Sequence, residues 1–143
     1  MKRQDKFPDT STFHFYNANP KNKIGDDCVV RAIAAALNQS WEQTVRELTE
    51  VGLKYGYVLN DEHAFERYLK NKGWIKHKQP RKSDNTRYRG YEFCKLLQLR
   101  GKTENIIANI GSHHVVAIID GKINDIVNST DGCIGNFWTY GGE

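Results

Sequence analysis

Three residues of this chain have the types and surroundings that covalent catalysis needs: Cys28, His114 and Asp125. Cys28 begins the run CVVRAIAAAL, and a thiol at a helix start ionises more easily because of the helix dipole and the free N–H groups there. An imidazole can take the thiol proton, and a carboxylate can hold that imidazole in one orientation. The three residue types therefore predict a thiol nucleophile with a histidine base and an acidic orienter.

The register of a predicted β-hairpin determines which histidine lies next to which polar residue. The Asp-Gly dipeptide at 120–121 indicates a two-residue type I′ turn between HVVAII and KINDIV. With this turn, strand alternation puts His114 and Asp125 on one face as diagonal neighbours. His113 would point the other way, toward Asn128, so His113 with Asn128 is the alternative pair.

The order of these residues resembles the papain-like cysteine peptidase superfamily, in which a helix starts with Cys, a strand with His, and a later strand carries Asp or Asn. HVVAI is similar to the His strand of papain, and KINDIVNS is similar to the strand that reads KNSW there. Aligning DIV with NSW selects Asp125, whereas aligning NST selects Asn128. The stretches GDDCVVRAI, SWEQTV and HHVVAIIDGKINDIVN also resemble GDCVIRAI, SYEEV and HVVAIxDGKxxDTWD of small cysteine-peptidase-like proteins from bacteria and phages.

This resemblance spans residues 17–130 and departs from the pattern where Val127 replaces the tryptophan of DTW. It implies a papain-like fold and a thiol hydrolase that cleaves a peptide or isopeptide bond in a protein or peptide substrate, with no metal or cofactor. It also implies an oxyanion hole built from Asn22, six residues before Cys28, and from the Cys28 N–H. If the chain comes from a phage, the implied substrate is a host protein in the host cytoplasm.

Hydrophobic patterning predicts the elements that would position these groups. Residues 1–27 are rich in turn residues and predict an extended segment, with Asp26 or Asp27 as the N-cap of the helix that follows. The patterns predict helices over 28–38, from Ser40 to about Gly52, from Asp61 to Gly73 and over 91–99, then strands at NIIANI, HVVAII, KINDIV and CIGNFWTY within 105–140. Helices first and hairpin strands afterwards predict one α+β domain over 1–143, with the helical part (28–101) packed on a C-terminal antiparallel sheet.

The composition indicates the cellular compartment and the redox state of these thiols. The three cysteines are too few and too scattered for a disulfide framework or a zinc site, so we expect Cys94 and Cys133 to be structural. No window approaches the roughly 18 apolar residues of a membrane span, and MKRQDKFPDTST carries no apolar signal region. We therefore expect a cytoplasmic protein with reduced thiols and no membrane contact.

One segment supports a different class of function. Residues 76–90 hold six Lys or Arg and one acid, with Tyr88 among them. Such a segment is either a solvated basic loop or a surface that contacts nucleic acid or an acidic protein. The alternative to an enzyme is therefore a non-catalytic binding module that uses 76–90. The sequence leaves open the oligomeric state, the identity of the substrate, and whether the enzyme is a peptidase, isopeptidase, amidase, deamidase or transglutaminase.

Overall fold

The computed structural model describes residues 1–102 and 104–142. In chain order its elements are α1 (Arg3–Lys6), β1 (Phe13–Phe15), α2 (Cys28–Leu37), α3 (Trp41–Tyr55), α4 (Glu62–Asn71), β2 (Trp74–His77), α5 (Gly90–Leu99), β3 (Ile106–Ile110), β4 (His114–Ile119), β5 (Lys122–Asp125) and β6 (Ile134–Tyr140). The predicted α+β class is confirmed, because α2 and α4 pack on a sheet built mainly from the C-terminal strands, and α3 packs on these two helices.

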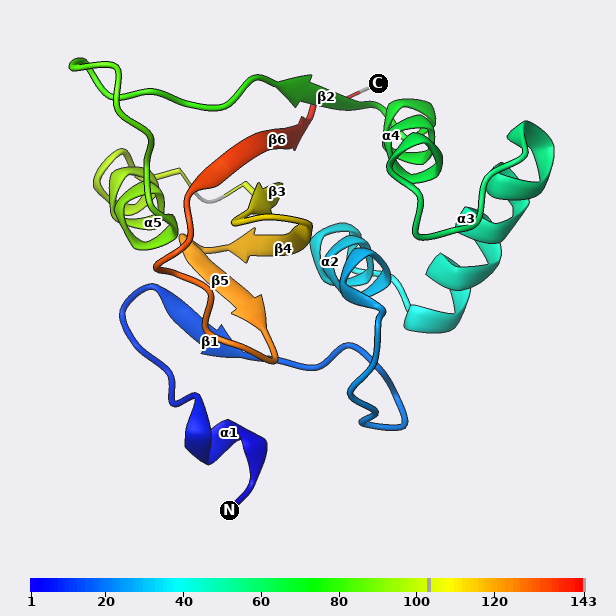
Figure 1. Cartoon of the computed structure of the whole chain (residues 1–143), viewed down its shortest axis with the longest axis horizontal. Coiled ribbons are helices and arrows are strands. Elements are labelled where there is room, and N and C mark those ends of the chain that lie inside the picture. The colour runs from blue at the N-terminus through cyan, green and yellow to red at the C-terminus, as the bar shows by residue number, and fades with distance from the viewer. Residues whose placement is uncertain (103, 143) are drawn as a thin grey trace.

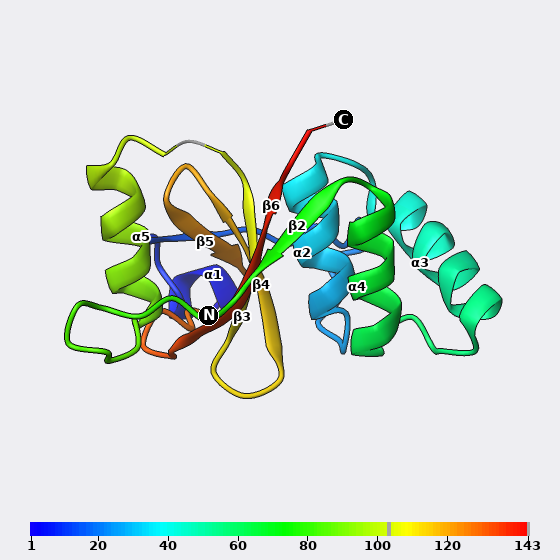
Figure 2. The ribbon, with the colours of Figure 1, turned by 90° about the horizontal axis from the view of Figure 1, so that it is seen from above.

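Figure 2 shows the sheet between two helical layers, with α2, α3 and α4 on one side and α5 on the other. One apolar cluster joins α2 to β4 and includes Ile33, Val115 and Trp138. A second cluster lies under α5 and includes Phe93 and Val116. No helix in the described ranges has both the length and the apolar character needed to cross a membrane.

The sheet has the strand order β1-β5-β4-β3-β6-β2 (Figure 1). The strands within 105–140 pair antiparallel as predicted, whereas the N-terminal β1, which was not predicted, pairs with β5 in parallel and makes the whole sheet mixed. The extended segment 1–27 contains β1 and the short α1, and the basic segment 76–90 begins inside β2. Both missed strands are edge strands of three or four residues, too short to carry a clear alternation of their own.

Several helices are bounded by residues that favour helix ends: side-chain N-caps before the first turn and left-handed residues after the last turn. Asn38, after α2, takes a left-handed conformation with φ 52°, and Gly73, after α4, has φ 86°. The Ser40 side chain accepts the N–H of Gln43 and caps α3, and Asp61 caps α4 in the same way through the N–H of His63. The α3 helix continues past Gly52 to Tyr55, so its predicted end was too early.

The hairpin that carries the candidate site is formed as predicted. Asp120 and Gly121 have φ values of 53° and 71°, as a type I′ turn requires. Ile119 pairs with Lys122 and Ala117 with Asn124, which is the register expected for a two-residue turn. This register sets the diagonal relation between the first residue of β4 and the last residue of β5.

Candidate active site

The first residues of α2 and β4 and the last residue of β5 come together at one end of the sheet. Nε2 of His114 donates to Oδ2 of Asp125 at 2.6 Å, which confirms the contact that strand alternation predicted. The Cys28 thiol makes a hydrogen bond with the His114 side chain and a second one with the backbone of Val115. Because Nε2 is occupied by Asp125, Nδ1 is the ring nitrogen left to face the thiol.

The electrostatics of the pair favour a charged thiol and a charged imidazole. Burial raises the pKa of the Cys28 thiol, but the hydrogen bonds with His114 and Val115 and the charges of His114 and Arg31 outweigh burial, so the pKa lies below its ordinary value. The hydrogen bond to Asp125 and the contact with Cys28 raise the pKa of His114 to about 9, against the effect of burial. Both shifts act in the direction that favours a thiolate–imidazolium pair.

A buried arginine behind the pair was not singled out from the sequence as a site residue. Arg31 is only 7% exposed, and its Nε donates to Oδ1 of Asp27 at 2.8 Å. Its Nη1 forms an ion pair with Oδ1 of Asp125, the carboxylate whose other oxygen holds His114. The available signal was a single charged residue in an otherwise apolar helix, since a buried arginine needs a charged partner.

Asp27 lies at the N-cap position of α2, but its side chain does not cap the helix. Its carboxylate accepts from Arg31 and, through Oδ2, from Nε1 of Trp41 at 2.9 Å. Asp27 is therefore the N-cap residue, as expected, but its carboxylate makes no capping hydrogen bond. An unpaired anion next to the thiol would raise the thiol pKa, but Arg31 balances the charge of Asp27.

The alternative pair of polar residues does not form. His113 is exposed and has a left-handed backbone with φ 69°, immediately before β4. The side chain of Asn128 accepts from the backbone N–H of Thr130 at 3.0 Å and from its hydroxyl at 2.6 Å, which makes a local turn. Asn128 is thus used to shape the loop after β5, and the structure brings His114 and Asp125 together instead.

A pocket of about 550 Å³ opens beside Cys28, between α2, α4 and the sheet. Its floor is apolar, from Val29, Phe65 and Val115, and its rim includes His113 and Asn109. We call this space the Cys28 pocket. It leaves the thiol open to a ligand on the side away from Asp125.

The predicted oxyanion residue, Asn22, does not line the Cys28 pocket. Asn22 is exposed on the loop before α2, where its Oδ1 accepts from Asn17 at 3.3 Å. A carboxamide that does line the pocket is Asn109, whose Cα is paired with that of Val115 across β3 and β4. Sequence reasoning missed Asn109 because only the β3–β4 register brings it into the lining of the Cys28 pocket.

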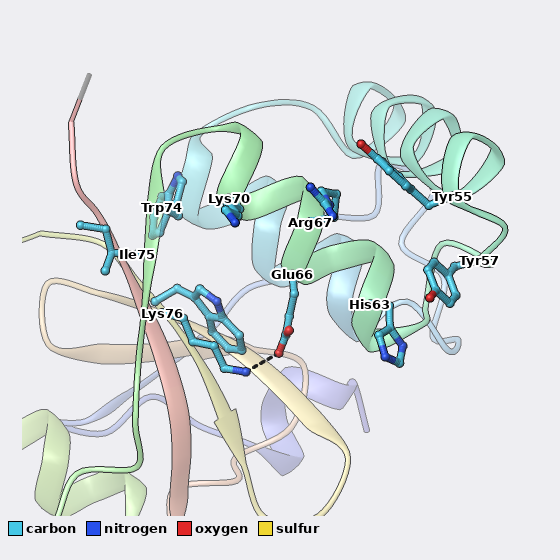
Figure 3. A pocket seen from close by; sticks show the side chains of 10 residues that line it. Tyr55, Tyr57, His63, Glu66, Arg67, Lys70, Trp74, Ile75 and Lys76 are labelled. Atoms are coloured by element: carbon cyan, nitrogen blue, oxygen red, sulfur yellow. Dashed lines mark hydrogen bonds and ion pairs between the residues drawn. The ribbon is translucent and has the colours of Figure 1, made fainter.

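A larger hollow of about 700 Å³ lies on the other side of α4 (Figure 3). Its lining combines aromatic and basic side chains, among them Tyr55, Tyr57, Arg67, Lys70, Trp74 and Lys76. Figure 3 shows Glu66 reaching toward Lys76, and their ion pair spans 2.6 Å. Cys28, His114 and Asp125 are absent from the lining of this hollow, so its size alone does not mark the reactive site.

The described part of the chain contains no group of three or more His, Cys, Asp or Glu residues arranged to hold a metal ion. The chain was compared with protein-family models, with curated proteins and with solved structures, and none of them matches it. Any function must therefore be argued from the geometry of the site itself.

Proposed function

We propose that this protein is a thiol hydrolase that cleaves an acyl bond, in the manner of papain-like cysteine peptidases, with a peptide or isopeptide as substrate. The single observation that carries the proposal is the chain of contacts from Asp125 through His114 to Cys28, with 2.6 Å between His114 and Asp125. A nucleophile, a base and an orienting acid in contact are the arrangement that covalent acyl transfer requires.

In the proposed mechanism the Cys28 thiolate attacks the substrate carbonyl and forms a tetrahedral intermediate. Cys28 is the first residue of α2, so its own N–H has no acceptor within the helix and can donate to the oxyanion. We assign the second donor to Asn109 rather than to the predicted Asn22, because Asn109 lines the Cys28 pocket. The His114 imidazolium then gives its proton to the leaving amine, and a water molecule activated by neutral His114 hydrolyses the thioester.

The alternative function, a binding module without catalysis, would leave the Cys28 contacts without a role. The two functions would use different sites, because the basic residues of 81–89 line a different pocket from Cys28. A basic surface and a reactive thiol can therefore be tested by different variants.

The proposal is tested by digestion of a proteome-derived peptide library, with new N-termini counted by mass spectrometry. We expect the wild type to create new termini and Cys28→Ala to create none. His113→Ala is the matched control, because it removes an exposed histidine next to His114 and leaves the His114 ring in place. If wild type and Cys28→Ala give the same termini, or if Cys28 reacts as a thiolate and no acyl bond is hydrolysed, the hydrolase proposal is wrong.

A further inference from the structure

The basic segment forms an ordered hairpin rather than a loose loop. Arg81 and Arg87 are partners in an antiparallel bridge. Between them the N–H of Lys82 donates to the carbonyl of Thr86 at 2.8 Å, and the N–H of Asn85 donates to the carbonyl of Lys82 at 2.8 Å. We call residues 81–89 the basic hairpin. Figure 1 shows it as the outlying turn between β2 and α5, at the opposite end of the molecule from α3.

The base of the basic hairpin is fixed to the rest of the protein. Arg89 bridges to Cys133, just before β6, and the carbonyl of Tyr88 accepts the N–H of Ile134 at 2.8 Å. Lys82 forms an ion pair with Glu92 of α5. The arginines are therefore presented from a hydrogen-bonded frame, which lowers the entropy lost when a ligand binds them.

In the described ranges, the arginine charges of this hairpin are not balanced by ion pairs, although that of Lys82 is. A pocket of about 490 Å³ is lined by Arg81, Lys82, Arg87 and Arg89, and the acid in its lining, Glu92, is already paired with Lys82. Within residues 1–102 and 104–142, none of these three arginines forms an ion pair with a carboxylate.

Two of these guanidinium groups instead donate to carbonyl oxygens. Arg81 donates to that of Asn85 at 3.2 Å, and Arg89 donates to that of Asp131 at 2.7 Å. Like charges placed opposite one another on paired strands are destabilising, so the facing pair Arg81 and Arg87 does not help the fold. An external anion would relieve the repulsion.

We propose that the basic hairpin binds the phosphodiester backbone of a nucleic acid. Three of its four cationic side chains are arginines, and the guanidinium fork matches the oxygens of a phosphate in two parallel hydrogen bonds. Tyr91 lines the same pocket, and an aromatic ring beside phosphate-binding arginines is what nucleic-acid proteins use to contact bases. The combination favours nucleic acid over an acidic peptide. It does not depend on hydrolysis at Cys28.

The test is fluorescence anisotropy with labelled duplex DNA, single-stranded DNA and single-stranded RNA of one length, and with a polyglutamate peptide of the same total charge. The variant is Arg81→Gln/Arg87→Gln. The matched control is Arg46→Gln/Lys54→Gln, which removes the same two positive charges from exposed positions of α3. Binding is measured from low to moderate salt, and thermal melting confirms that both proteins fold.

We expect the hairpin variant to bind nucleic acid at least about tenfold more weakly, with a salt dependence shallower by about two phosphate contacts. The α3 control should lose no more than about twofold. Arg89→Gln is a second variant that leaves the Arg81–Arg87 bridge in place, and it should lose about one contact. The three nucleic acids show whether the phosphates are read from a duplex or from a single strand.

Three results would overturn the proposal. Equal losses in the hairpin and α3 variants would mean that only net charge matters. Tighter binding of polyglutamate than of every nucleic acid would identify an acidic protein as the partner. Absence of binding to all four probes at low salt would leave the basic hairpin as a solvated surface. Cys28 labelling is expected to be the same in all variants, so each result is independent of the proposed hydrolase.

Discussion

Two cysteines of this protein, the partly buried Cys28 and the buried Cys94, share several features of their surroundings but differ in the contacts that determine reactivity. Cys28 and Cys94 both lie in helices that pack on the sheet, and each thiol is close to one backbone amide of a strand residue, Val115 or Ile123. Burial raises the pKa of Cys94 to about 12, whereas the pKa of Cys28 is below its ordinary value. The main difference is His114, which is in contact with Cys28, whereas no histidine of the described residues acts on the pKa of Cys94.

The comparison shows that burial and one backbone donor do not make a reactive thiol. Cys94 lies in the middle of α5, among apolar side chains, while Cys28 is the first residue of α2. The helix start supplies free N–H groups, and the histidine supplies a positive charge and a proton acceptor. Substitutions that remove or keep one part of this difference at a time should therefore change the reactivity of Cys28 by different amounts.

The largest effect is expected from His114→Ala, which should make Cys28 resemble Cys94. Without the imidazole, burial dominates and the thiol pKa rises above its ordinary value, so very little thiolate remains at pH 6. Iodoacetamide labelling of Cys28 at pH 6, followed by peptide mass mapping, should slow by at least about 100-fold. His113→Ala should label like the wild type, and equal rates in wild type and His114→Ala would show that the pair does not exist.

The same pair fixes the expected pH dependence in the wild type. A lowered thiol pKa means that the Cys28 thiolate, and therefore labelling, is already present below pH 9. A raised imidazole pKa means that the proton needed by the leaving group is present at neutral pH and is lost as the pH rises through about 9. Hydrolysis should therefore fall above about pH 9 while labelling does not.

The next largest effect is expected from Asp125→Asn. The substitution removes the anion that raises the pKa of His114, so that pKa falls. The imidazolium then stabilises the Cys28 thiolate less. Labelling at pH 6 should slow by about tenfold, and the free energy of unfolding should fall by about 3–5 kcal/mol because Arg31 loses a buried partner. Chemical denaturation gives the second quantity.

Asn128→Ala is the control for this substitution. Asn128 accepts hydrogen bonds from Thr130 alone, so labelling should be unchanged and stability should fall by about 1 kcal/mol or less. A larger loss of labelling in Asn128→Ala than in Asp125→Asn would reverse the assignment of the orienting residue.

Arg31→Met should affect the thiol less than either triad substitution. The long apolar side chain keeps much of the packing volume, but Asp27 and Asp125 lose the charge between them, so we expect a loss of about 3 kcal/mol in unfolding free energy. Labelling at pH 6 should slow only a few-fold, because the charge of Arg31 lowers the pKa of Cys28 less than the contacts with His114 and Val115 do.

Arg31→Lys separates charge from geometry at this position. Lysine keeps the positive charge but cannot reach both carboxylates with the guanidinium fork. We expect labelling to stay near the wild-type rate and stability to recover only in part. If Arg31→Lys labels as slowly as Arg31→Met, orientation of Asp125 rather than charge is what Arg31 supplies.

The parts of this site that were predictable from sequence are the parts set by local rules. The Asp-Gly turn at 120–121 determined the hairpin register, and that register brought His114 to Asp125. The capping side chains Ser40 and Asp61 likewise located two helix starts. In each case a few neighbouring residues contain the whole signal.

The parts that sequence reasoning missed depend on contacts between distant segments. Arg31 reaches Asp125 across 94 positions of the chain, and Asn109 enters the Cys28 pocket only through the pairing of β3 with β4. β1 joins the sheet through a parallel pairing with β5 that no turn connects. Such contacts are decided by packing of the whole domain, so a local pattern does not contain them.

The smallest effect on reactivity is expected at Cys94 itself. Cys94→Ala leaves the Cys28 contacts intact, so labelling of Cys28 should not change, while the small cavity under α5 should lower the free energy of unfolding by about 1 kcal/mol. Cys94→Ser places a hydroxyl among apolar side chains and should cost about 2 kcal/mol. In the wild type, Cys94 should be labelled only after unfolding. Labelling of native Cys94 at a rate near that of Cys28 would contradict the comparison, because it would mean that burial does not suppress a thiol that lacks a histidine.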